Sequence, residues 1–169
     1  MRIAFYHKVS RVWDGRTADG EPLGGTQTAI IGLTRALAAL GHDVLVFGTP
    51  AAPIVCDGVS YHGASALPTV LRQAPIDVLV SVVNTELFRL GIKAPLNLFW
   101  SHNDYRHFLE GEAADLHATL AEDLARRAHK VIAVSDWHAD LLRQVFQLPA
   151  DHVWATRNGV APADLPARP

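Results

Sequence analysis

Short, continuously apolar segments recur along the whole sequence, and they constrain its fold more than any other feature. Each is rich in β-branched or aromatic residues, and none alternates between apolar and polar positions. This pattern is typical of strands that are buried on both faces, as the strands of parallel sheets are. We therefore predict core strands at residues 2–7, 43–48, 77–83, 96–100 and 130–135.

Patterns of helical period separate these strands. Apolar residues recur at spacings of three and four in residues 26–40 and 112–129, and again after Ser135, which is a good N-cap. Because strands and helices alternate, we predict an α/β fold with a doubly wound, mainly parallel, Rossmann-like sheet. The expected apolar faces consist of Ile30, Leu33, Leu37 and Leu40 in the first helix, Leu116, Leu120 and Leu124 in the second, and Trp137, Leu141, Leu142 and Val145 in the third.

The remaining segments complete one domain. Residues 59–63 have the pattern of a short strand, residues 65–73 that of a short helix, and residues 152–156 that of a last strand. An Asn-Gly turn and three prolines then favour irregular structure. Because 169 residues are too few for two ordinary domains, we expect one Rossmann-like domain at 1–157 and the start of an interdomain linker at 158–169.

Charge and composition exclude several classes of function. A net charge of −2 provides no general attraction for nucleic acid. No apolar run approaches the ~20 residues that span a bilayer, and the start of the chain lacks the apolar core of a signal peptide. The single cysteine, Cys56, excludes an internal disulfide and suits a core position in a reducing compartment. We expect a cytoplasmic protein, with peripheral membrane contact through Arg126 and Arg127 as an open alternative.

Polar residues follow several of the predicted strands, where doubly wound sheets bind their ligands. Asn84 follows the third strand, His102, Asn103 and Asp104 follow the fourth, and Ser135 ends the fifth. The carboxyl ends of parallel strands share one edge of the sheet. We therefore predict that these residues contribute to a substrate site at that edge.

Gly24 and Gly25 precede the first predicted helix. They are adjacent and lie far beyond the first strand, whereas a dinucleotide fingerprint needs alternating glycines directly after the strand. A P-loop is also excluded, because no Lys-Ser or Lys-Thr follows. A helix N-terminus with glycines does suit a phosphate, since free N–H groups point outward and no Cβ obstructs the ligand. The equally favoured alternative is a plain turn with Thr26 as N-cap.

His102 is a candidate for chemistry at the mouth of a cleft. Its imidazole can hydrogen-bond a substrate hydroxyl or carry a proton. A metal site with Asp104 and His107 is a competing hypothesis, although the spacing matches no common zinc pattern. The third interpretation is a hydrogen-bonded loop histidine without a catalytic role. Trp13, in the long loop after the first strand, is a further candidate for a binding surface.

Three stretches together resemble the N-terminal half of a GT-B glycosyltransferase of family 4. They are residues 24–48, the WSHND segment at 100–104, and residues 131–160, where a strand ending in Ser leads through a helix to a strand that runs into Asn-Gly-Val. The resemblance implies transfer of a sugar from a nucleotide-sugar donor to a sugar, a lipid-linked or another acceptor, in a cleft between two Rossmann-like domains. It also implies that the N-terminal domain, at residues 1–157, is the acceptor side and that the second domain holds most of the nucleotide.

The same resemblance implies roles for individual residues. Gly24, Gly25 and Thr26 would lie near the donor diphosphate, and His102 would face the transferred sugar and orient it. The reaction would retain the configuration at the sugar carbon and would need neither a metal ion nor a cofactor.

The second domain of such enzymes has no counterpart in this sequence. Family members usually carry there two glutamates separated by seven residues, and no two glutamates of this chain have that spacing. We therefore expect the C-terminal nucleotide-sugar domain to be a missing partner, and little transfer by this chain alone. The alternative hypothesis is a stand-alone Rossmann-type module that binds a nucleotide, sugar or protein without catalysis.

Overall fold

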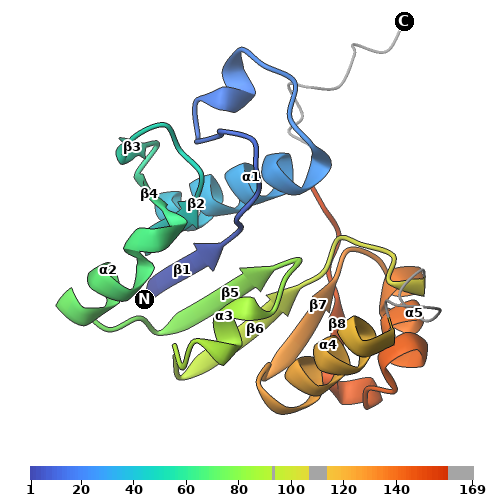
Figure 1. Ribbon diagram of the computed structural model, residues 1–169. Helices are drawn as coiled ribbons and strands as arrows, with labels where there is room; N and C mark the ends of the chain where they lie inside the picture. Colours follow the sequence, from blue (N-terminus) through green and yellow to red (C-terminus); the bar gives the residue numbers. More distant parts are fainter. Residues whose placement is uncertain (93, 107–113, 160–169) are drawn as a thin grey trace, which may run out of the picture.

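Eight strands form one sheet in the computed structural model, which describes residues 1–92, 94–106 and 114–159 (Figure 1). The strand order is β3-β4-β2-β1-β5-β6-β7-β8, and β3–β4 is the antiparallel pair in an otherwise parallel sheet. The strands are β1 (Arg2–Tyr6), β2 (Asp43–Gly48), β3 (Ile54–Cys56), β4 (Val59–Gly63), β5 (Val78–Val82), β6 (Leu96–Trp100), β7 (Lys130–Ala133) and β8 (Val153–Ala155).

Helices cover both faces of this sheet. In Figure 1, α1 lies behind the sheet, while α2, α3 and α4 lie in front of it. The predicted doubly wound, mainly parallel α/β fold is therefore confirmed. The helices are α1 (Gly25–Ala39), α2 (Leu67–Gln73), α3 (Glu86–Arg89), α4 (Ala114–Arg126) and α5 (Asp136–Phe146), with 3₁₀ turns η1 (Thr17–Asp19), η2 (Ala64–Ala66) and η5 (Ala150–His152).

The core consists of two layers because successive strand residues point to opposite faces. On one face, Ile3 and Phe5 of β1 pack with Ile30 of α1. On the other, Ala4 and Tyr6 belong to the cluster beneath α2 and α3, and the ends of β6 and β7 pack beneath α4 and α5. This burial on both faces explains why the strands are continuously apolar.

The strand order creates a topological switch point between β1 and β5. From β1 the chain adds β2 and β4 on one side, and then crosses to β5 and continues to β8 on the other. Ligands of such sheets bind outside the carboxyl ends of the strands at this point. The residue directly after β1, His7, lies there, and its Nδ1 donates to the Val82 carbonyl at 3.4 Å.

Helix α1 differs from its prediction in its N-cap and its buried face. Gly24 is the N-cap, in extended conformation, so the prediction of Thr26 as N-cap is wrong. Ile31 is buried, whereas Leu33 and Leu40 are 40% and 75% exposed. The helix packs over β1, β2 and β4, and its Leu33 side overhangs an open apolar groove of about 360 Å³ along β5 and β6.

Two tryptophans also differ from expectation. Trp137 is 63% exposed, so its prediction as a core residue is wrong, and the next residue, His138, is buried instead. Trp13 does not line a surface, because the loop after β1 folds back and buries its ring edge-on against Tyr61.

In α4, Leu120 and Leu124 are buried as predicted. The Leu116 side chain lies outside the described part of the structure.

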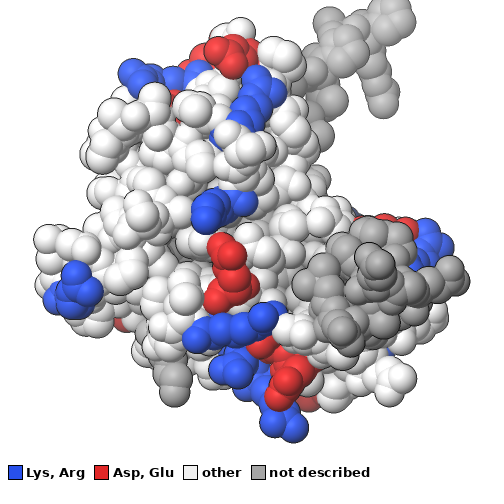
Figure 2. Space-filling model, in the orientation of Figure 1, with Lys and Arg blue, Asp and Glu red and all other residues white. Residues whose placement is uncertain are grey.

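Charged side chains gather in a band over α3 and α4 (Figure 2). The buried carboxylate of Asp123 accepts from Arg89 at 2.7 Å and from Arg127 at 2.9 Å, and Arg126 pairs with Glu122. The Arg89–Asp123 ion pair joins the two helices. Among the described helices, none has both the length and the apolar character that crossing a bilayer requires.

Candidate functional site

The carboxyl ends of β1, β5, β6 and β7 form the candidate site, as the sequence predicts. Backbone hydrogen bonds hold the segments after these strands together. Val83 N donates to the Trp100 carbonyl at 3.0 Å, and Ser101 N donates to the Ile132 carbonyl at 2.8 Å. Asn84, His102 and Ser135 thus follow neighbouring strands at one edge.

Two histidines at this edge are held in the neutral state. Burial, with smaller contributions from His7 and His138, lowers the pKa of His102 from 6.5 to about 4. Burial also lowers the pKa of His7. The His102 ring packs against Trp100 with the ring centroids 4.6 Å apart. A neutral imidazole can both donate and accept, so His102 is suited to orienting a hydroxyl group.

His138, which the sequence did not single out, positions the loop that carries His102. Its Nδ1 accepts from Val134 N at 3.3 Å, which places the ring hydrogen on Nε2. That Nε2 donates to the Asn103 carbonyl at 3.0 Å and lies 3.3 Å from Ser101 Oγ. Ser101 and Asn103, which lie on either side of His102 in the sequence, therefore both contact the buried His138 ring.

Ser135 and Asn103 contribute to this positioning through specific atoms. The Ser135 hydroxyl oxygen is the N-cap of α5 and accepts from His138 N at 3.1 Å. Asn103 uses its backbone carbonyl, and its side chain is exposed at the edge. Contact of either side chain with a substrate stays a prediction.

Asn84 lies in a strained turn after β5. The preceding residue, Val83, has φ 74°, which is a left-handed conformation that β-branched residues rarely adopt. Ser81 Oγ donates to the Asn84 carbonyl at 2.6 Å, and Tyr105 donates its hydroxyl to the Val83 carbonyl at 3.0 Å. The Asn84 Oδ1 atom is buried without a partner in the described structure. Surrounding contacts therefore hold a costly turn in place at the switch point.

Asp104 is engaged with a neighbouring side chain. Its carboxylate accepts from Arg106 Nε at 2.9 and 3.0 Å, in an exposed ion pair. His107, its suggested partner in a metal site, lies outside the described residues. In the described part of the chain, no group of three His, Cys, Asp or Glu side chains is arranged to hold a metal ion.

Gly24, Gly25 and Thr26 lie at the N-terminus of α1, with both glycines exposed. A Cβ on Gly24 would lie 2.7 Å from Gln27 Oε1, whereas a Cβ on Gly25 would meet no atom within 4 Å. Packing within the chain therefore does not require glycine at position 25. The first N–H groups of a helix have no intrahelical partner, so this end can accept an anion.

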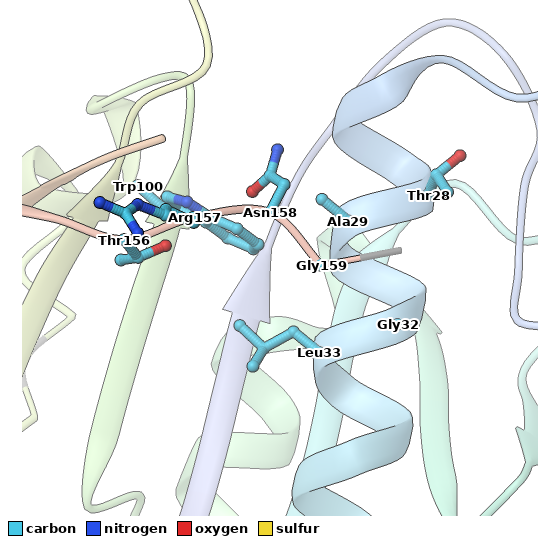
Figure 3. Close-up of a pocket in the computed structure, with 9 residues that line it drawn as sticks. All are labelled: Thr28, Ala29, Gly32, Leu33, Trp100, Thr156, Arg157, Asn158 and Gly159. Carbon is cyan, nitrogen blue, oxygen red and sulfur yellow. The ribbon is translucent and has the colours of Figure 1, made fainter. Parts of the chain in front are cut away.

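A cavity of about 380 Å³ lies beside this edge, between α1 and the segment after β8 (Figure 3). Thr28 and Ala29 of α1 face Trp100, Arg157 and Asn158 across it. Trp100 also contacts His102, which connects this cavity with the histidine cluster. None of the site residues predicted from the sequence lines this cavity, because the prediction considered only the residues after the strands and the start of the first helix.

Comparisons with known proteins bear on the family and the fold of this chain. The model of Glycosyltransferase Family 4 matches residues 23–164. No curated protein sequence matches the chain at a significant level. Among solved structures, Anabaena Alr3699/HepE in complex with UDP-glucose superposes with a TM-score of 0.64 at 15% identity, covering 97% of this chain and 47% of that one. A glycosyltransferase from Rickettsia africae ESF-5 gives 0.55 at 12% identity, covering 98% and 46%. The chain thus spans less than half the length of the structures it matches.

Proposed function

Because this chain belongs to Glycosyltransferase Family 4, we propose that it forms the N-terminal half of an enzyme that transfers a sugar from a nucleotide-sugar donor to an acceptor. The observation that carries the proposal is the neutral His102 after the carboxyl end of β6, where the buried His138 ring holds Ser101 and Asn103 on either side of it. A ligand-bound relative of the same fold, HepE, is described with UDP-glucose, which supports UDP-glucose as the first donor to test.

In the proposed mechanism, α1 receives the donor diphosphate. The free N–H groups after Gly24 and the positive end of the helix dipole would offset the charge on the departing nucleoside diphosphate. His102 would hydrogen-bond the transferred sugar and orient its anomeric carbon. Fixed donors of this kind supply the charge stabilisation that a metal ion supplies in other enzymes, so we propose a metal-independent reaction. We also propose that the reaction retains the anomeric configuration.

We propose that the rest of the donor site belongs to a second domain. The matched structures are about twice as long as this chain, which leaves room in them for such a domain. Closure of two domains would exclude water that could hydrolyse the donor. The 169-residue chain alone would then bind the donor weakly and transfer little sugar.

For the compartment, we propose the cytoplasm. The single Cys56 is half-buried and forms no disulfide, which suits a reducing environment. The alternative of peripheral membrane contact through Arg126 and Arg127 is not favoured, because both side chains form ion pairs with acidic residues of α4.

The test is a titration of the ¹⁵N-labelled chain with UDP-glucose, followed by amide chemical shifts. We expect shifts at Gly24, Gly25 and Thr26 and at the loop around His102. A titration with NAD⁺ is the matched control, because the dinucleotide fingerprint is missing. Absence of shifts at α1 at millimolar UDP-glucose would contradict the proposal. Donor binding without transfer by the complete two-domain protein would favour a binding module.

A further inference from the structure

A further cavity, of about 430 Å³, lies at the amino ends of β6 and β7, on the edge of the sheet opposite the candidate site. Its volume lies within the range of small-molecule sites. Asn97 of β6 and His129, which directly precedes β7, line it together with Arg126 and Arg127 at the end of α4. Among the described residues on its wall there is no Asp or Glu side chain. The fold thus brings nitrogen-bearing side chains from three segments to one cavity.

Asn97 and His129 each keep one donor group for a ligand. The Asn97 side chain is 8% exposed, and its Oδ1 accepts from Ala94 N at 3.2 Å, so the amide nitrogen Nδ2 is the remaining group. The Nδ1 atom of His129 accepts from Asn97 N at 2.9 Å, which places the ring hydrogen on Nε2. Neither this Nδ2 nor this Nε2 donates to any described residue. A nearly buried amide and an oriented imidazole are therefore both available to a ligand in the cavity.

The buried carboxylate of Asp123 orients the guanidinium group of Arg127. Its Oδ1 accepts from Arg127 Nε at 2.9 Å, and its Oδ2 accepts from Arg89 Nε at 2.7 Å. One negative charge is thus shared between two guanidinium groups. The terminal Nη1 and Nη2 groups of Arg127 donate to no residue in the described part of the chain. Arg127 therefore presents oriented donors and a positive charge that Asp123 neutralises only in part.

Arg126 adds a second cation to the same wall. Its ion pair with Glu122, at 3.3 Å, is exposed, and exposed pairs are weak, so the pair competes little with a ligand. The C-terminal end of α4 carries partial negative charge, which opposes an anion, and the two arginines offset it. A phosphate monoester has three terminal oxygens and a charge between −1.5 and −2 at about pH 7, which suits several donors and two cations.

We propose that this cavity binds a phosphate monoester, with Arg127, Asn97 and His129 as hydrogen-bond donors to the phosphate and Arg126 as the second cation. Ile92 and its apolar neighbours on the wall contact the rest of the ligand. Because the donors line a cavity, the expected ligand is a soluble phosphate ester; a lipid headgroup could present the same group. The ligand does not compete with the proposed sugar-nucleotide donor, since the two sites lie at opposite ends of the strands.

The test is a titration of the ¹⁵N-labelled chain with glycerol 3-phosphate at constant ionic strength, with glycerol as the uncharged control. We expect shifts of the Asn97 side-chain amide and of the Arg127 and His129 backbone amides, and none with glycerol. Absence of these shifts at millimolar glycerol 3-phosphate, or shifts confined to the N-terminus of α1, would overturn the proposal.

Charge variants test whether the arginines bind the phosphate. Arg127→Gln should weaken glycerol 3-phosphate about tenfold, as loss of a charge-assisted hydrogen bond does. Because Arg127 also pairs with Asp123, the second variant is Arg126→Glu, at an exposed side chain, and it should also weaken binding about tenfold. Arg72→Glu, at an exposed arginine in the last turn of α2, is the matched control and should change nothing. Equal effects of Arg126→Glu and Arg72→Glu would show attraction by net charge alone and overturn the site.

Vesicles separate the two sources of the phosphate. Phosphatidylcholine vesicles that contain phosphatidic acid present a phosphate monoester at a lipid surface. Sedimentation of the chain with these vesicles, without shifts from glycerol 3-phosphate, would overturn the soluble ligand in favour of a lipid. Shifts from glycerol 3-phosphate without sedimentation would support the soluble ligand. The proposed function is tested separately, because UDP-glucose is expected to shift α1 and not this cavity.

Discussion

The buried ring of His138 donates from Nε2 to the backbone carbonyl of Asn103 at 3.0 Å, and this bond anchors the loop that carries His102. The bond joins the start of α5 to the end of β6, two segments that are remote in sequence. His138 is therefore a positioning residue, whereas in the proposed mechanism His102 contacts the sugar. The two roles lead to different predictions.

Replacing His138 should impair turnover through geometry. His138→Leu keeps the bulk but leaves Val134 N and the Asn103 carbonyl without partners, so we expect the free energy of unfolding to fall by about 1–3 kcal/mol and kcat to fall at least about tenfold. His138→Gln, which can still donate to Asn103, should recover most of kcat. Equal kcat values for the two variants, at temperatures where both are folded, would show that this bond does not position His102.

Replacing His102 tests whether its imidazole contacts the substrate, as the proposed mechanism requires. In the complete enzyme, we expect His102→Ala to lower turnover by a factor on the order of 100 with the thermal midpoint nearly unchanged. His42→Ala is the control, because His42 directly precedes β2, at the amino ends of the strands, and contacts the Met1 amino group. A rate near that of the unmodified enzyme would exclude His102 from the mechanism.

The lowered pKa of His102 also predicts how stability depends on pH. The folded pKa is about 4 and the ordinary value is 6.5, so the unfolded chain binds more protons between these values. Stability should therefore be complete above pH 6.5 and decrease as the pH falls toward 4, and the lowered pKa of His7 acts in the same direction. Urea unfolding at pH 7.0, 5.5 and 4.5 measures this. His102→Gln should reduce the dependence of the free energy of unfolding on pH. An unchanged dependence would show that other groups cause it.

The parallel sheet was predictable from the sequence because strands buried on both faces are continuously apolar. Short elements carry less of this signal: β3 has three residues, and its Val55 is 69% exposed. Helix α3 has four residues and no helical period. The positive φ of Val83 was also missed, because contacts from other strands impose it against the preference of valine.

The candidate site was predictable in its place and less so in its detail. Polar residues after parallel strands must share an edge, and Asn84, His102 and Ser135 do. On α5, Leu141 and Leu142 are buried as predicted, but Trp137 is not, because Trp137 and His138 are adjacent and apolar character favours the tryptophan. His138 is buried only because Val134, Asn103 and Ser101 supply hydrogen-bond partners, two of them from a distant loop.

Because Val83 lies in a strained turn, we expect Val83→Gly to be more stable than Val83→Ala, which is the reverse of the usual order. Val83→Ala and Val83→Gly lose similar packing, but only glycine adopts φ 74° without strain. We expect the glycine variant to be more stable than the alanine variant by about 1 kcal/mol, in urea unfolding. A more stable alanine variant, the usual order elsewhere, would show that the turn relaxes at no cost.

Gly25 separates the two hypotheses for the glycine pair, a plain turn and an anion site. A side chain at position 25 meets no atom of the chain within 4 Å, so Gly25→Val should leave the thermal midpoint nearly unchanged. If the donor diphosphate binds at this helix end, the added methyl groups obstruct it, and we expect the donor KM to rise about tenfold or more. Gly20→Val, also unobstructed but in the loop before α1, is the matched control and should leave the donor KM unchanged. Because the anion-site hypothesis requires a ligand where the protein leaves open space, an unchanged KM for Gly25→Val would leave the turn as the sole role of this glycine.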